Sequence, residues 1–254
     1  MEQPSGISVK PGQVLSTRAI TRLLESLAPA AGVPASALYV RPGQVQQFLA
    51  AQGSEGRTWW EQLSGMDRSI LDSDTGLAAL RCGDRGLVIL PPYPLLEEII
   101  SPSWNTRPLL TLLETEYTIG VILLRLGRFS VAVFQGRELL TAKTDARYVK
   151  GRHAAGGTSQ KRYQRIREGQ VRRLYDKTCA AVQTQFGSVA QEVDFILLGG
   201  DKFTLEGFLK VCPYVERQRD KILDRRLNVR DPKRDTLEEV AGMLGECRVY
   251  PLQW

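Results

Sequence analysis

Residues 118–134 read TIGVILLRLGRFSVAVF, and this stretch predicts the central strands of the fold. Two apolar runs, 118–126 and 128–134, have the length and the β-branched and aromatic content of strands. Gly127 separates them, which predicts a tight hairpin. A second turn at Gly136-Arg137 leads into residues 138–143, which predicts a third antiparallel strand.

The rest of the chain from residue 85 alternates strand-like and helix-like segments. Short buried strands are predicted at 87–90 and 194–198, with a final strand at 247–251. A long helix is predicted over about 160–186, and shorter helices over 205–211 and 237–244. Hairpin strands followed by alternating strands and helices predict an α/β domain over residues 85–254, with a mixed sheet and helices packed on it.

Residues 1–84 predict a smaller, mostly helical N-terminal region of unknown role. Ser16 or Thr17 is a suitable cap for a helix whose apolar residues repeat at helical spacing. A second helix is predicted after Pro42, and residues 53–84 are rich in Gly, Ser and Asp, which indicates irregular connections with short helices. The chain therefore predicts two domains, 1–84 and 85–254.

Composition excludes several classes of protein. Apolar residues make up 43% of 254, enough for a packed core. The apolar run 119–124 ends at Arg125, far short of the ~20 residues of a membrane span, and residues 1–15 lack the apolar segment of a secretory signal. These features predict a cytoplasmic protein without membrane contact. Four scattered cysteines and a single histidine predict reduced, chemically idle thiols, no metal site and no cofactor.

Positive charge is concentrated in one segment. Residues 143–177 contain eleven Lys or Arg and three acids, a net charge of +8, so that the remainder carries −2 of the overall +6. Such an excess is typical of phosphate binding by nucleic-acid-binding proteins. The alternative is a solvated helix face, although solubility alone normally mixes both signs.

The basic segment contains a loop of small residues. Lys150, Arg152 and His153 precede Gly156-Gly157, and Thr158 or Ser159 then suits the cap of the long helix. Adjacent glycines allow close approach of the backbone to a ligand. They also suit a plain loop and cap, or an anion site at the helix start. The spacing does not match a phosphate-binding P-loop.

The segment from Lys150-Gly151-Arg152 through GGTSQKRY (156–163) resembles the Vms-like (ANKZF-type) release-factor domain, and most closely its actinobacterial and Chloroflexi branch. That family is similar to the catalytic middle domain of the eukaryotic class-one peptide-chain release factor, which has an RNase H-like α/β fold. The resemblance extends over residues 86–254. It implies a peptidyl-tRNA hydrolase that frees nascent chains from stalled ribosomes in ribosome quality control.

The resemblance assigns roles by position. Gln160 is the implied catalytic residue, and Gly156 and Gly157 let the loop reach the peptidyl-transferase centre. Thr158 and Ser159 stand between the glycines and the glutamine, whereas the eukaryotic factors have them contiguous. The expected partners of a monomeric protein are the large ribosomal subunit, through its rRNA, and peptidyl-tRNA. The expected RNA contacts are Lys150, Arg152, His153, Lys161, Arg162, Arg165 and Arg172.

Two rival functions remain open. One is a ribosome- or RNA-binding factor without catalysis that uses the same basic helix. The other is a nuclease acting on tRNA, which in a metal-dependent form needs several convergent carboxylates. Asp145, Asp194 and Asp201 have no clustered spacing, and we expect ion-pair and capping roles for them.

Overall fold

The computed structural model describes residues 9–151 and 158–254. The chain divides into two compact units. Unit 1 comprises residues 1–115 and 244–254, and unit 2 comprises residues 116–243. No helix within the described ranges has both the length and the apolar character of a membrane span.

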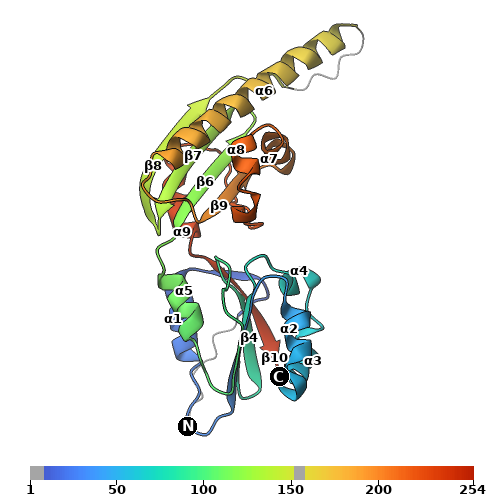
Figure 1. Cartoon of the computed structure of the whole chain (residues 1–254), viewed down its shortest axis with the longest axis vertical. Helices are drawn as coiled ribbons and strands as arrows, with labels where there is room; N and C mark the ends of the chain where they lie inside the picture. Colours follow the sequence, from blue (N-terminus) through green and yellow to red (C-terminus); the bar gives the residue numbers. More distant parts are fainter. Residues whose placement is uncertain (1–8, 152–157) are drawn as a thin grey trace. The chain divides into compact units, whose positions relative to one another are not determined.

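Unit 2 is built on the predicted hairpin, which the structure confirms (Figure 1). Its four strands lie in the order β8-β7-β6-β9, with β6 and β9 parallel and the other pairs antiparallel. Arg125 pairs with Arg128 at the turn, and Gly127 there has a φ of 102°, which favours glycine. The strands are β6 (Thr118–Arg125), β7 (Arg128–Gln135), β8 (Glu138–Ala146) and β9 (Phe195–Gly200).

Alternation along β7 assigns the two faces of this sheet. Phe129, Val131 and Val133 are buried in one core with residues of the long helix α6 (Thr158–Gly187). Ser130 points to the other face and donates or accepts a hydrogen bond with Thr144 at 2.8 Å. Helices α7 (Lys202–Leu209) and α8 (Pro213–Glu216) contribute to the same core as α6.

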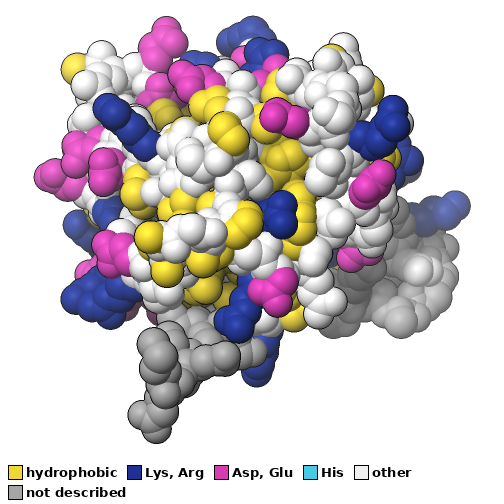
Figure 2. Space-filling model, turned by 90° about the horizontal axis from the view of Figure 1, so that it is seen from below, with side chains coloured by type: hydrophobic (Ala, Val, Ile, Leu, Met, Phe, Trp, Pro, Cys, Tyr) yellow, Lys and Arg dark blue, Asp and Glu magenta, His cyan; other side chains and the backbone are white. Residues whose placement is uncertain are grey.

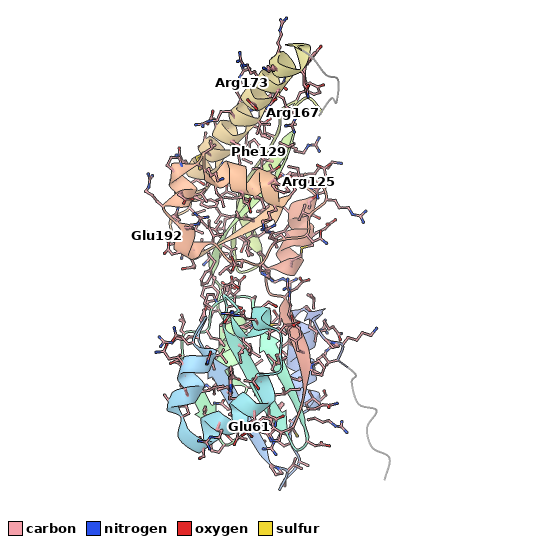
Figure 3. The ribbon with its side chains drawn as sticks, turned by 90° about the vertical axis from the view of Figure 1, so that its right-hand side faces the viewer. Glu61, Arg125, Phe129, Arg167, Arg173 and Glu192 are labelled. Carbon is pink, nitrogen blue, oxygen red and sulfur yellow. A yellow bond between two sulfur atoms is a disulfide. The ribbon has the colours of Figure 1, made fainter. Side chains whose placement is uncertain are left out.

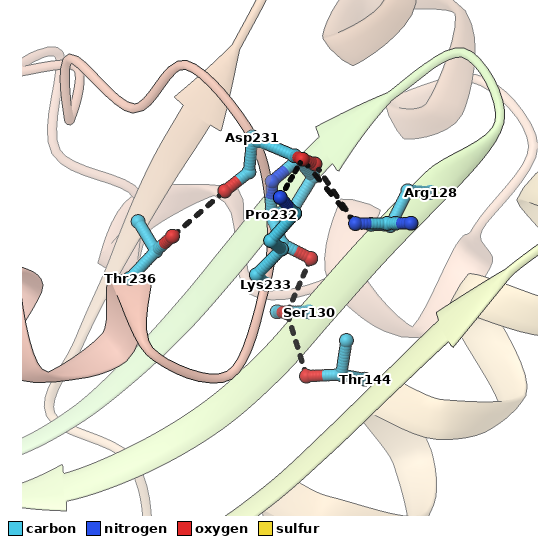
Figure 4. Close-up of polar contacts among 7 residues, drawn as sticks. All are labelled: Arg128, Ser130, Thr144, Asp231, Pro232, Lys233 and Thr236. Atoms are coloured by element: carbon cyan, nitrogen blue, oxygen red, sulfur yellow. Dashed lines mark hydrogen bonds and ion pairs between the residues drawn. The ribbon is translucent and has the colours of Figure 1, made fainter.

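The second face of the sheet carries the segment that leads to α9 (Thr236–Met243). Figure 4 shows how this segment is held: the carbonyl of Pro232 accepts a hydrogen bond from Ser130 at 2.9 Å, and Asp231 pairs with Arg128 at 3.2 Å. The Thr236 hydroxyl donates to the carbonyl of Asp231 at 2.8 Å. A short 3-10 helix η1 (Arg219–Lys221) precedes this segment.

A disulfide joins Cys179 of α6 to Cys212, the residue before α8. The prediction that all four cysteines are reduced is therefore wrong for this pair. The two residues are 33 apart in sequence, but α6 and α8 pack on one core and bring their Cα atoms to 5.4 Å. Cys82 and Cys247 are free thiols.

Unit 1 contains a six-stranded antiparallel sheet in the order β1-β10-β4-β3-β2-β5. Its strands are β1 (Gln13–Leu15), β2 (Ala35–Val40), β3 (Leu77–Cys82), β4 (Arg85–Leu90), β5 (Ile99–Ser101) and β10 (Cys247–Gln253). Its helices are α1 (Thr17–Ser26), α2 (Val45–Ala51), α3 (Gly53–Leu63), α4 (Arg68–Leu71) and α5 (Arg107–Glu114). Ser16 caps α1 as predicted, with its hydroxyl accepting from the Ala19 N–H.

Two predictions about this region need correction. The boundary at residues 84 and 85 cuts through the β3–β4 hairpin, and the mostly helical reading missed β1, β2 and β3. β10 returns from the far end of the chain to pair with β1 and β4. Pairing between segments so distant in sequence leaves no local pattern, so the sequence did not place 85–115 and the C-terminal strand with residues 1–84.

Candidate nucleic-acid interface

The N-terminal part of α6 extends beyond the sheet on which its C-terminal part packs (Figure 1). Every residue from Gln160 to Ile166 is exposed, whereas Leu174, Thr178 and Val182 are buried. A helix that packs on a sheet buries one face along its length. The continuous exposure over two turns therefore marks a free segment, which we call the stem (residues 160–166).

Residues 147–150, which follow β8, are bound to α6 near the base of the stem. The backbone N–H of Lys150 donates to Gln170 Oε1 at 3.0 Å, and Arg167 Nε donates to the carbonyl of Lys150 at 3.1 Å. Residues 167–170 lie nine to twelve positions after the first residue of α6. At 1.5 Å per residue, the helix start lies roughly 14–18 Å beyond this anchor.

Cations along this part of unit 2 are mostly unpaired. Of the basic residues between 143 and 177, Arg172 pairs with Asp176 at 3.0 Å and Lys177 pairs with Asp145. Within the described ranges, the others form no ion pair: Lys143, Arg147, Lys150, Lys161, Arg162, Arg165, Arg167 and Arg173. Figure 3 labels Arg167 and Arg173 on α6. Four of these residues are exposed on α6 and form a surface suited to phosphates: Lys161, Arg162, Arg165 and Arg173.

Positive charge is not concentrated everywhere on the surface. On the face drawn in Figure 2, acidic and basic side chains are interspersed among apolar ones. Both signs are normally mixed in this way on a surface that serves solubility. The concentration of positive charge is thus a property of residues 143–177.

Asp145 links β8 to the buried half of α6. Its hydrogen bond and ion pair with Lys177, more than any other contact, hold the pKa of this carboxyl below its ordinary range. Asp145 is therefore a structural anchor of the helix that carries the stem. Burial, and secondarily the nearby Asp201 carboxylate, raise the pKa of the Tyr175 phenol, which keeps that group neutral.

The structure describes most but not all of the predicted site. Gln160 lies in the first turn of α6 and is exposed, next in sequence to Lys161 and Arg162. Lys150, Arg165 and Arg172 lie along the same helix or against it. Arg152, His153, Gly156 and Gly157 fall outside the described residues. The helix begins at Thr158, so Thr158 and Ser159 belong to its first turn, and their predicted capping role stays a prediction.

The three carboxylates considered for metal-dependent chemistry have the structural roles expected of them. Asp194 Oδ2 accepts from the Thr118 N–H at 2.7 Å, and Asp201 caps α7 by accepting from the Thr204 N–H at 2.9 Å. Asp145 is engaged by Lys177. In the part of the chain that the structure covers, no group of three His, Cys, Asp or Glu is arranged to hold a metal ion.

Some residues of this region were not foreseen from the sequence. Gln170 and Arg167 anchor Lys150, and the Lys150 ammonium lies 5.2 Å from the ring centroid of Tyr163. These contacts depend on residues 147–150 lying alongside α6. Periodicity within α6 gives no signal for them.

Comparison with known proteins assigns the chain to a family. A family model described as the Actinobacteria/chloroflexi VLRF1 release factor matches residues 117–249, more than half of the chain. The chain belongs to this release-factor family. The resemblance noted in the sequence is thereby confirmed, and so is a mixed α/β fold.

More distant relatives of this release-factor chain are archaeal. Peptide chain release factor subunit 1 of Methanopyrus kandleri is 28% identical over 124 residues, covering 48% of this chain and 30% of that protein. The protein of the same name from Pyrobaculum aerophilum is 26% identical over 138 residues, covering 54% and 35%. The chain thus spans about a third of the length of these relatives. The archaeal termination factor aRF1 aligns with 17% identity and a TM-score of 0.39, over 91% of this chain and 72% of that one.

Proposed function

We propose that this member of the release-factor family hydrolyses peptidyl-tRNA on the large ribosomal subunit and so frees nascent chains from stalled ribosomes. The observation that carries the proposal is the position of Gln160. It lies exposed in the first turn of a helix that projects from its sheet and carries unpaired cations. The family and the archaeal release-factor relatives support the same class of reaction.

The chemistry suits an amide side chain. The bond to be cleaved is an ester between a peptide and the terminal ribose of tRNA, and water attacks it slowly unless it is held in line with the carbonyl. Gln160 is uncharged and does not act as a base at neutral pH, but its amide orients water or stabilises the developing oxyanion. Such a mechanism needs neither a triad nor a metal within the protein. The ribosome and the tRNA hydroxyls complete the site.

The cations near Gln160 are the reason why we propose RNA as the partner. Lys161, Arg162 and Arg165 lie within the stem, and the N-terminus of α6 adds the positive end of the helix dipole. Phosphates of rRNA and tRNA are the complementary ligands. We place Arg152 and His153 in the same contact by their sequence position beside Lys150.

The test is peptide release by purified protein from large subunits or whole ribosomes that carry peptidyl-tRNA. We expect Gln160→Ala to reduce the rate of release at least about tenfold, because a positioned donor is lost, while ribosome binding persists. Gln164→Ala is the matched control, since Gln164 is an exposed glutamine one turn along the same helix. Equal release by wild type and Gln160→Ala would refute the catalytic role and favour a binding factor.

A further inference from the structure

Two exposed tyrosines lie within the basic segment, residues 143–177. Tyr163 is 51% and Tyr148 is 77% exposed, and Ile166, one turn beyond Tyr163, is 39% exposed. Tyr163 is three residues after Gln160, so the two side chains are neighbours on one side of α6. Tyr148 lies in the segment that is fastened to α6 by Lys150. Val149, the residue between Tyr148 and Lys150, packs against the core of unit 2, whereas Tyr148 is exposed.

The ring of Tyr163 lies beside a cation. The Lys150 ammonium is 5.2 Å from the ring centroid, a cation–π contact, and the backbone of Lys150 is bound by Gln170 and Arg167. Half of the Tyr163 side chain stays accessible. An accessible aromatic ring beside Lys and Arg side chains is the arrangement with which proteins stack unpaired nucleobases.

We propose that Tyr163, assisted by Tyr148, stacks on an unpaired nucleobase of the bound RNA and thereby aligns that RNA with Gln160. This inference rests on the proposed function. It adds that the protein recognises a single-stranded base as well as the phosphate backbone. Cations alone bind paired and unpaired RNA in proportion to charge. Tyr163 adds a preference for the unpaired form.

The experiment compares two RNA hairpins with equal numbers of phosphates, one blunt and one with a single-stranded 3′ extension that contains 2-aminopurine. Binding of the extended hairpin should weaken roughly 5- to 160-fold in Tyr163→Ala, the range for loss of one stacked base, and binding of the blunt hairpin should change less than about twofold. Tyr163→Phe should retain wild-type affinity. Wild type and Tyr163→Phe should quench 2-aminopurine fluorescence, and Tyr163→Ala should not.

Phe203→Ala is the matched control. Phe203 is 84% exposed in unit 2 but lies on α7, outside the basic segment, so its loss should leave both affinities unchanged. Equal binding of both hairpins by Tyr163→Ala and wild type, or an equal loss for both hairpins, would overturn the stacking role.

The release assay separates this inference from the proposed function. Loss of the hairpin preference in Tyr163→Ala together with normal release by Gln160→Ala would leave the stacking role in place and refute the catalysis. An unchanged hairpin preference in Tyr163→Ala, together with slow release by Gln160→Ala, would refute the stacking role and support the catalysis.

Discussion

Two residues of unit 2, Gln160 and Asp145, differ in how much the fold depends on their side chains. The Gln160 side chain is exposed and forms no hydrogen bond with the described residues, so its replacement should leave the fold intact. Asp145 is three-quarters covered at its side chain and pairs with Lys177. Substitution of Gln160 therefore tests function. Substitution of Asp145 tests how much its contact with α6 stabilises unit 2.

Asp145→Asn should lower the free energy of unfolding at neutral pH by up to about 1 kcal/mol, since the pair is only partly buried. The pKa of Asp145 is lowered in the folded state, so the stabilisation is present above the unfolded pKa of about 3.9. It is lost as the pH falls through the lower folded pKa. Urea unfolding of wild type and variant from pH 7 to pH 2.5 measures the difference, which should shrink toward zero.

A double-mutant cycle provides the control for the Asp145 prediction. In a Lys177→Met background, Asp145→Asn should lose most of its pH-dependent effect, because the partner is gone. A difference between wild type and Asp145→Asn that stays constant over this pH range would contradict the assignment.

Among the secondary-structure elements, α6 has two parts with different surroundings: an exposed stem and a C-terminal half that packs on the sheet. Its C-terminal half is fixed by close approach to the sheet: a Cβ on Gly120 of β6 would lie 2.3 Å from Cζ of the buried Phe186. The disulfide from Cys179 adds a covalent link from the same half to the segment before α8. This firm base is what allows the stem to extend without packing of its own.

Gly120→Ala should destabilise unit 2 by about 1–3 kcal/mol, because the added methyl group would overlap the ring of the buried Phe186 and force it to shift. Gly169→Ala is the control of opposite sign. Gly169 lies inside α6 with open space where its Cβ would be, so alanine there should stabilise the helix by about 0.5–1 kcal/mol. Amide hydrogen exchange of β6 and α6 measures both, and equal stability of Gly120→Ala and wild type would show that the close approach is wrong.

For the whole molecule, the separation of charge determines how binding responds to salt. The basic segment carries +8 and the rest of the chain −2, so that one region dominates the attraction to RNA. Each phosphate contact by Lys or Arg contributes to the salt dependence of the affinity through release of counterions.

Replacement of Arg162 and Arg165 by alanine should reduce the slope of log affinity against log salt by about 1–2 in magnitude. Arg18→Ala together with Arg57→Ala changes the net charge equally but acts on exposed residues of α1 and α3 in unit 1, and it should leave the slope unchanged. Affinities for large subunits at several salt concentrations provide the measurement. Equal slopes for the two double variants would locate RNA binding elsewhere.

Local sequence patterns were enough to predict the β6–β7 hairpin around Gly127, the long helix and the basic segment, which contains the stem. Each depends on periodicity, turn chemistry or charge within a few residues. Tertiary structure alone decided that β10 joins the sheet of unit 1, that Cys179 meets Cys212, and that Lys150 lies against Tyr163. These contacts join segments that the local pattern treats as independent, because only packing of the whole chain brings them together.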